Sequence, residues 1–152
     1  TYQGLVHRLQ YLGIIDNIEF INDSKATNAE STEKALNSLK DSGDIYWIAG
    51  GLAKEEGIEP IKKLLKNIKY AFLIGQAKDE FAQVLNKINV KYKLSNTLDI
   101  AFKDAIKIIS KEPKERKKII LLSPACASFD QWKNFEQRGE RFIQLVKDLI
   151  KG

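Results

Sequence analysis

Short apolar runs alternate along this chain with segments in which apolar residues recur at helical spacing. The runs are DIYWIAGG (residues 44–51), YAFLIG (70–75) and IILL (119–122), with a shorter VKYKL at 90–94. Unbroken apolar strands separated by amphipathic helices are typical of a mostly parallel sheet that is covered on both faces. We therefore predict an α/β fold, a three-layer Rossmann-like domain whose sheet has about six strands.

A hairpin near the start of the chain should add one antiparallel strand to that sheet. Apolar-rich segments at 8–15 and 18–22 flank the pair Asp16-Asn17, which is a two-residue turn signal. Helices are expected at residues 29–39, 60–65, 81–88, 98–109 and 128–150. Asn28 is a good N-cap for the first of them, and Ser128 to Gln131 matches the S-x-x-Q capping pattern for the last.

The composition narrows the functional classes. At 152 residues the chain has enough material for one domain, and no apolar run is long enough to span a membrane. A single cysteine cannot form an internal disulfide, and one cysteine with one histidine argues against a zinc site built by this chain alone. We expect a cytoplasmic protein with no signal peptide and no membrane contact.

The positive charge raises the question of a nucleic-acid partner. The net charge is +5 and the pI is near 9.2. Most of the positive residues are lysines, however, and acids lie among them, as in KEPKERKK. Mixed charges of this kind are typical of solvated helix faces, so we expect no nucleic-acid partner.

Polar and small residues follow the predicted strands. In open α/β sheets, ligands bind beyond the carboxyl ends of the strands. The segments at those ends are NDSKATN (22–28), AGGLAK (49–54), LIGQ (73–76) and LSPACAS (122–128). The sequence therefore predicts a ligand site at this edge of the sheet.

Several side chains in these loops suit an anionic ligand. Lys25 is a cation where helix starts usually favour acids, and Asp23 could accept a hydroxyl or a metal-bound water. Ser128 precedes a predicted helix, whose N-terminus attracts anions, although this serine could equally act only as a cap. Lys54 is a weaker signal, since loop lysines are usually solvated. Cys126 is expected to be a buried core thiol without a histidine to activate it.

Taken together, the loops resemble one family. HRLQ near the start, NDSKATN followed by ST, AGGLAK, and LSPACASFDQWKNFEQRGERF look like the C-terminal domain of the Mur ligases, in its D-glutamate-adding branch. The resemblance extends from Gly4 to the end of the chain. It implies that residues 1–7 are the end of an interdomain linker and that 8–152 form the amino-acid-binding domain. The uridine-nucleotide domain and the central ATPase domain would then lie outside this chain.

The resemblance also implies a reaction. ATP phosphorylates the carboxyl group of UDP-N-acetylmuramoyl-L-alanine, and the amine of D-glutamate attacks the resulting acyl phosphate during peptidoglycan precursor synthesis. ATP and Mg²⁺ are the implied cofactors, with the metal ligands outside this chain and none in this domain. The isolated domain is expected to be inactive, since it has no G-x-x-x-x-G-K-[ST] motif.

Site residues can be assigned by motif position in that family. Lys25 should lie beside the reacting carboxyl and phosphate groups. The D-glutamate carboxylates should be bound by Thr27, Lys54, Ser128 and the backbone N–H of Phe135. Arg8 should reach the ATP phosphates and Asp23 the ribose hydroxyls, with His7 and Asn28 as further candidates. The chain departs from some members at Leu52, where they have an acid in the glycine loop.

Two other functional classes remain as alternatives. One is a free-standing Rossmann-like module that binds an acidic metabolite or a nucleotide, and the other is a basic nucleic-acid-binding domain. The long motif matches favour the ligase domain over both, and the interleaved acids count against the second.

Overall fold

The computed structural model describes residues 3–152, and within them the main sheet has seven strands. Its order is β1-β2-β3-β8-β4-β6-β7. The strands are β1 (Gln3–Leu5), β2 (Arg8–Ile15), β3 (Ile18–Asn22), β4 (Asp44–Gly50), β6 (Tyr70–Ile74), β7 (Tyr92–Asn96) and β8 (Lys118–Leu122). Strands β3, β8, β4, β6 and β7 run parallel, and β2 is antiparallel to both of its neighbours. This confirms the predicted α/β class with one antiparallel strand from the hairpin.

The hairpin forms at the predicted turn. Asp16 and Asn17 have φ of 51° and 66°, which is the left-handed conformation that a type I′ turn requires, and Ile15 pairs with Ile18 across it. The strand β1 was not predicted. The proposed linker covers residues 1–7, of which 1 and 2 lie outside the described residues, while 3–5 pair with β2.

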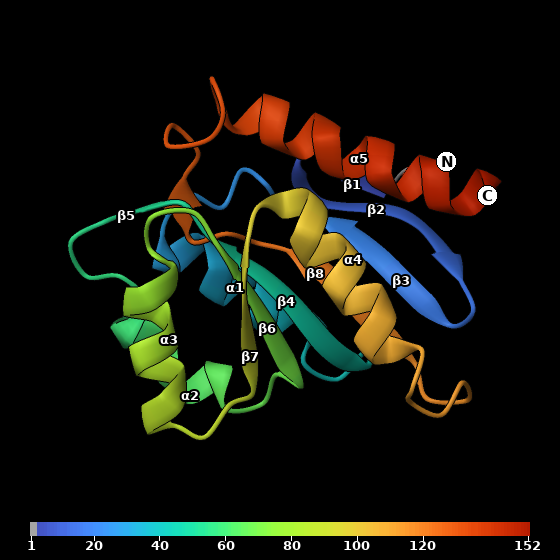
Figure 1. The fold of residues 1–152 in the computed structure, drawn as a ribbon, viewed down its shortest axis with the longest axis horizontal. Helices are drawn as coiled ribbons and strands as arrows, with labels where there is room; N and C mark the ends of the chain where they lie inside the picture. Colours follow the sequence, from blue (N-terminus) through green and yellow to red (C-terminus); the bar gives the residue numbers. More distant parts are fainter. Residues whose placement is uncertain (1–2) are drawn as a thin grey trace.

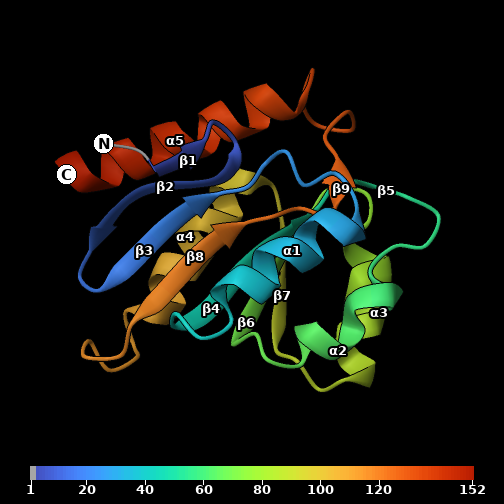
Figure 2. The ribbon, with the colours of Figure 1, turned by 180° about the vertical axis from the view of Figure 1, so that it is seen from behind.

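Helices cover both faces of the sheet, as Figures 1 and 2 show from opposite sides. Strand residues alternate between the two faces, so Trp47 enters one core cluster and its neighbours Tyr46 and Ile48 enter the other. One face carries α1 (Ala29–Leu39), α2 (Lys62–Leu65) and α3 (Lys78–Lys87). The other carries α4 (Leu98–Ile109) and α5 (Phe135–Lys151). The predicted three layers are therefore present.

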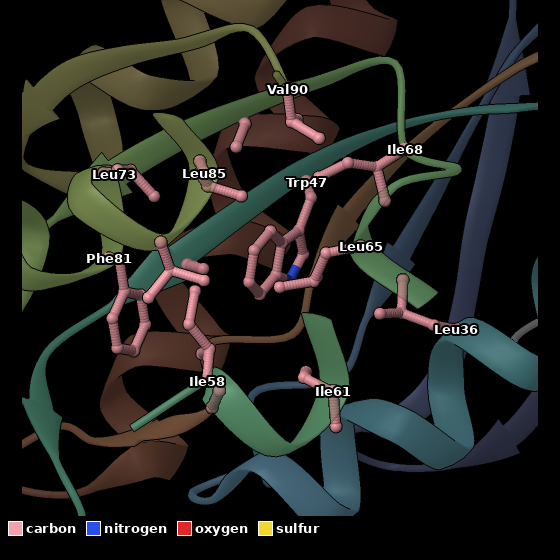
Figure 3. Packing of buried hydrophobic residues seen from close by; sticks show 14 of the residues in the cluster. Leu36, Trp47, Ile58, Ile61, Leu65, Ile68, Leu73, Phe81, Leu85 and Val90 are labelled. Atoms are coloured by element: carbon pink, nitrogen blue, oxygen red, sulfur yellow. The ribbon is translucent and has the colours of Figure 1, made fainter. Parts of the chain in front are cut away.

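Trp47 lies at the centre of the larger core. Figure 3 shows its indole ring in the middle of the labelled side chains, which include Leu36 of α1 and the apolar residues Ile58, Ile61 and Leu65. The predicted helix at residues 60–65 is a 3-10 turn, Glu59–Ile61, followed by the single helical turn of α2. None of the helices in the described chain combines the length and hydropathy needed to cross a membrane.

The last helix begins later than predicted. Ser128 was expected to cap it, but α5 starts at Phe135, with Asn134 as the N-cap. The Asn134 side chain accepts a hydrogen bond from the Gln137 N–H (2.8 Å), and Gln137 Oε1 accepts one from the Lys133 N–H (3.0 Å). The residues before Asn134 make tertiary contacts instead, so the prediction for this boundary was wrong. The Asn28 cap of α1 is confirmed, since its side chain accepts from the Ser31 N–H.

Candidate functional site

A pocket lies at the carboxyl end of β3, beside the start of α1. Its volume is about 180 Å³, and its walls are Arg8, Leu9, Asp23, Lys25, Ala26, Ser31, Lys34 and Ala35. It brings together three of the predicted site residues, Arg8, Asp23 and Lys25. Lys34 was missed by the sequence analysis, although it lies one helical turn beyond Ser31, on the same side of α1. Three cations and one acid therefore share this pocket.

Asp23 is the buried member of this group, with only 4% of its surface exposed. Its Oδ1 accepts the backbone N–H of Leu9 (3.1 Å), and its Oδ2 accepts the hydroxyl of Ser123 (2.7 Å). Burial raises the pKa of the carboxyl group to about 6, although both hydrogen bonds and the nearby Arg8 favour its ionised form. Its charge therefore changes just below neutral pH.

This raised pKa predicts a change in stability with pH. Between the ordinary pKa of 3.8 and about 6, the folded state keeps a proton that the unfolded state has lost. The free energy of unfolding therefore has its full contribution from this carboxyl group at low pH. That contribution is lost as the pH rises through this window. Asp23→Asn should therefore unfold less readily than the wild type at pH 7.5, by about 1–2 kcal/mol, and gain little at pH 4.

Denaturant unfolding of both proteins at the two pH values measures this difference. Comparing variant with wild type cancels the titration of the other acids. A difference that is the same at pH 4 and pH 7.5 would show that the Asp23 carboxylate carries no burial cost.

Arg8 reaches the pocket from a tight turn. His7 and Leu9 have φ of 65° and 44°, which is unusual for side chains other than glycine. Three hydrogen bonds hold this turn: the His7 N–H donates to Gln10 Oε1, the Lys25 N–H donates to the His7 carbonyl, and the Leu9 N–H donates to Asp23. The loop that carries Lys25 therefore also fixes the backbone around Arg8.

His7 itself is buried between this turn and α5. Asn22 Nδ2 donates to His7 Nδ1 (2.9 Å), because the Asn22 Oδ1 is already accepting the Ser24 N–H. The ring proton therefore lies on Nε2, which faces Glu140 at 3.5 Å. The ring also meets Phe135 edge-on, with centroids 6.2 Å apart. These contacts give His7 a packing role, and its assignment as a binding residue stays a prediction.

Arg138 connects three loops and was missed by the sequence analysis. It is 1% exposed, and its guanidinium donates to Ser24 Oγ (2.9 Å), to the Ser24 carbonyl (2.6 Å) and to the Cys126 carbonyl (3.0 Å). Ser24 in turn donates to the Phe135 carbonyl (2.8 Å). Burial lowers the pKa of Arg138 to about 10, so it stays protonated at neutral pH. The available signal was an arginine at the helical spacing of Phe135 and Phe142.

Lys54 and Ser128 flank a second small ladder at the same edge of the sheet. Strand β5 (Leu52–Ala53) pairs antiparallel with β9 (Cys126–Ala127), as Figure 2 shows. A side chain at Gly51 would overlap the Ala127 carbonyl, so glycine is required where the two loops meet. Lys54 follows one end of this ladder and Ser128 the other.

Ser128 is notable for its hydroxyl group. The residue is 2% exposed, and its Oγ has no hydrogen-bond partner among the described residues. A buried hydroxyl without a partner usually costs stability. The carbonyl of Ser128 accepts from the Gln131 and Trp132 N–H groups, so its backbone starts a turn rather than a helix.

The loop after Ser128 is attached to the ends of two other strands. Asp130 Oδ2 accepts the Gln76 N–H (2.9 Å), and Gln131 Nε2 donates to the Asn96 carbonyl (2.8 Å). Gln76 follows β6 and Asn96 ends β7. The loop therefore crosses the carboxyl edge of the sheet and fixes the position of Ser128.

The predicted site residues thus form two groups, and the first of them lines the pocket beside α1. In the described chain, the pocket beside α1 does not include Thr27, Lys54, Ser128 or Phe135. Thr27 is half-buried in the loop two residues after Lys25, and Asn28 is occupied as the α1 cap. Phe135 is the first residue of α5, where a helix leaves backbone N–H groups without intrahelical partners.

Comparison with known proteins identifies relatives. The family model described as Mur ligase, glutamate ligase domain, matches residues 7–126. The chain is 50% identical over 149 residues to the UDP-N-acetylmuramoylalanine--D-glutamate ligase of Rickettsia bellii, covering 98% of this chain and 32% of that protein. It is 49% identical over 152 residues to the ligase of the same name from the Wolbachia of Brugia malayi, covering 98% of this chain and 29% of that protein. The chain therefore spans about a third of the length of these relatives.

Solved structures show the same fold. The UDP-N-acetylmuramate-alanine ligase MurC of Thermotoga maritima matches with a TM-score of 0.61 and 12% identity, over 95% of this chain and 31% of that one. MurF of Acinetobacter baumannii matches with a TM-score of 0.64 and 16% identity, over 93% of this chain and 31% of that one. At these identities the likeness concerns the fold alone.

Proposed function

This chain belongs to the Mur ligase family as a glutamate ligase domain, and we propose that it is the amino-acid-binding domain of an ATP-dependent ligase. The full-length enzyme would join D-glutamate to UDP-N-acetylmuramoyl-L-alanine in the bacterial cytoplasm during peptidoglycan precursor synthesis. The observation that supports this most is the carboxyl edge of the sheet, where cations, hydroxyls and backbone donors suited to a dicarboxylate and a phosphate gather.

The proposed reaction has two steps. A carboxylate oxygen of UDP-N-acetylmuramoyl-L-alanine attacks the γ-phosphorus of ATP, which releases ADP and leaves an acyl phosphate. The amine of D-glutamate then attacks the acyl carbon, and the tetrahedral intermediate releases phosphate and a proton to give the amide. Lys25 would neutralise negative charge near the reacting groups, so this domain contributes positioning and electrostatic stabilisation. Burial raises the pKa of Cys126 to about 12, which keeps it a thiol and unsuited to nucleophilic attack.

ATP would be bound only in part by this domain. Arg8, Lys25 and Lys34 would bind phosphate oxygens, while Asp23 would accept the ribose hydroxyls. Across residues 3–152, His, Cys, Asp and Glu side chains form no group of three or more that could hold a metal ion. In keeping with the family resemblance, Mg²⁺ and the P-loop would be supplied by the part of the enzyme outside this chain.

D-glutamate would be bound mainly by the second group of residues. Lys54 supplies a cation, and Ser128 supplies a hydroxyl whose donor has no partner among the described residues. Thr27 and the Phe135 N–H would complete the contacts to its carboxylates. The cost of leaving the Ser128 hydroxyl unpaired would be recovered when a carboxylate accepts from it.

Substitution of Lys54 and Ser128 in the full-length enzyme tests this assignment. Lys54→Met and Ser128→Ala should each raise the KM for D-glutamate roughly 30-fold, since a charge-assisted contact contributes about 2 kcal/mol. The KM for ATP should change much less. Steady-state kinetics with each substrate varied in turn measures both values.

The matched controls are Lys147→Met on the exposed side of α5 and Ser38→Ala on α1, which should leave both KM values unchanged. If Lys54→Met and Ser128→Ala behave like these controls, the assignment of the D-glutamate site is wrong. The isolated domain should bind D-glutamate weakly, because half of the site is elsewhere. Tight calorimetric binding by the domain alone would favour a free-standing sensor.

A further inference from the structure

A chain of buried polar groups leads from the protein core to Asp23. Trp47 Nε1 donates to the Ser123 carbonyl (2.7 Å), and Thr32 Oγ1 lies 2.9 Å from Ser123 Oγ and 3.2 Å from the Ser123 carbonyl. Ser123 Oγ then donates to Asp23 Oδ2 at 2.7 Å. Trp47, Thr32 and Ser123 are each 0% exposed. The chain therefore joins β4, α1 and the end of β8 to one oxygen of the pocket carboxylate.

The two hydroxyl donors in this chain point toward Asp23, whereas Trp47 donates to the Ser123 carbonyl. Ser123 donates its single hydroxyl proton to Asp23 Oδ2. In the short contact between the Thr32 and Ser123 hydroxyls, Thr32 must therefore be the donor and Ser123 Oγ the acceptor. Consecutive hydrogen bonds of this kind strengthen one another. Removing the Thr32 hydroxyl should thus weaken the bond to Asp23, although Thr32 acts on Asp23 only through Ser123 in the hydrogen bonds of the described residues.

The chain also leaves part of the Asp23 carboxylate free. A carboxylate has about four lone-pair sites, and the Leu9 N–H and the Ser123 hydroxyl occupy one on each oxygen. One site on each oxygen remains for a pair of neighbouring ligand hydroxyls, such as those of a ribose. This use requires the carboxylate to be ionised and to be fixed in orientation, and both conditions depend on Ser123.

We propose that Thr32 and Ser123 are positioning residues, which hold the Asp23 carboxylate in its charged form and in the orientation that accepts the hydroxyl pair of a nucleotide. This inference rests on the proposed function, in which Asp23 binds the ribose of ATP. Other charged groups also face Asp23: Arg8 from β2, Lys25 from the loop before α1, and Lys34 from α1. These cations favour the same charged form, so a test must alter the hydroxyls and leave the cations in place.

The test compares Thr32→Val with Thr32→Ser in the full-length enzyme. Valine keeps the shape and removes the hydroxyl, whereas serine keeps the hydroxyl. The ¹³C carboxyl resonance of Asp23, identified by its absence in Asp23→Asn, reports the titration directly. Thr32→Val should move its midpoint upward by roughly half to one pH unit. Thr32→Ser should keep the wild-type midpoint. Ser123→Ala should raise the midpoint more than Thr32→Val does.

Kinetics supplies a second readout. The KM for ATP in Thr32→Val should rise about 1.5- to 3-fold near pH 6.5 and approach the wild-type value at pH 8.5, where Asp23 is ionised in both proteins. The KM for D-glutamate should not change. An unchanged carboxyl midpoint in both Thr32→Val and Ser123→Ala, or no recovery in Thr32→Ser, would overturn the inference. If the enzyme lacks ligase activity, the proposed function fails, while the titration still decides this inference.

Discussion

Arg138→Met is expected to lower the free energy of unfolding by roughly 3 kcal/mol, because each buried acceptor left without a donor costs about 1–3 kcal/mol. The substitution leaves the carbonyls of Ser24 and Cys126 without the donors that the guanidinium provides. Removing a buried charge offsets part of this cost. The same change should lower kcat/KM of the full-length enzyme at least 100-fold, since misplacing catalytic groups by about 1 Å costs that much.

The functional loss follows from what Arg138 connects. Ser24 precedes Lys25 in the pocket, Cys126 lies on the ladder before Ser128, and the Phe135 carbonyl accepts from Ser24. Both groups of site residues should therefore be displaced together. We expect the KM for ATP and the KM for D-glutamate to rise in Arg138→Met, in contrast to Lys54→Met, which should affect D-glutamate alone.

Arg141→Met is the matched control, one turn further along α5. Arg141 is an arginine in a bidentate ion pair with Asp99, with distances of 3.0 and 2.6 Å, but its side chain is 37% exposed. An exposed ion pair contributes about 0–1 kcal/mol, so its loss should be small in denaturant unfolding. Arg138→Lys keeps the charge but loses the planar set of guanidinium donors. Its free energy of unfolding should lie between those of Arg138→Met and Arg141→Met. Equal unfolding free energies for Arg138→Met and Arg141→Met would contradict the role given to Arg138.

The elements that the sequence predicted well depend on local signals. The Asp16-Asn17 turn needs only two residues that tolerate positive φ, and the buried strands need only an unbroken apolar run. The Asn28 cap and the helix after it are likewise local. Because parallel strands end at one edge of a sheet, the Asp23 and Lys25 pocket followed from the order of strands and polar loops.

The start of α5 shows where local signals are insufficient. S-x-x-Q occurs at Ser128 to Gln131, and the similar N-x-x-Q occurs at Asn134 to Gln137. The sequence does not distinguish these two caps. Asp130 and Gln131 decide between them through contacts with the ends of β6 and β7, which are 54 and 35 residues away in the chain. Arg138 was missed for the same reason, since Ser24 lies 114 residues from it.

Replacing Gly139 by alanine should destabilise the protein, which is the opposite of the effect expected at most glycines in helices. Alanine in a helix interior is ordinarily more stable than glycine by about 1 kcal/mol. A methyl group at Gly139, however, would overlap His7 Nδ1 and stand 2.6 Å from His7 Cε1. His7 is held by Asn22 and is 4% exposed, so its ring cannot move aside without breaking that bond. We expect Gly139→Ala to lower the free energy of unfolding by about 2–3 kcal/mol.

A double-mutant cycle separates this collision from any general effect of the helix. His7→Ala removes the ring, so adding Gly139→Ala in that background should restore the ordinary helix preference and raise stability. The coupling energy between the two changes should exceed about 1 kcal/mol in equilibrium unfolding, as expected for residues in contact. Strictly additive effects would show that the ring does not rest on Gly139. The His7 turn carries Arg8 into the pocket, so Gly139→Ala should also raise the KM for ATP. That effect would connect the packing of α5 to the nucleotide side of the proposed site.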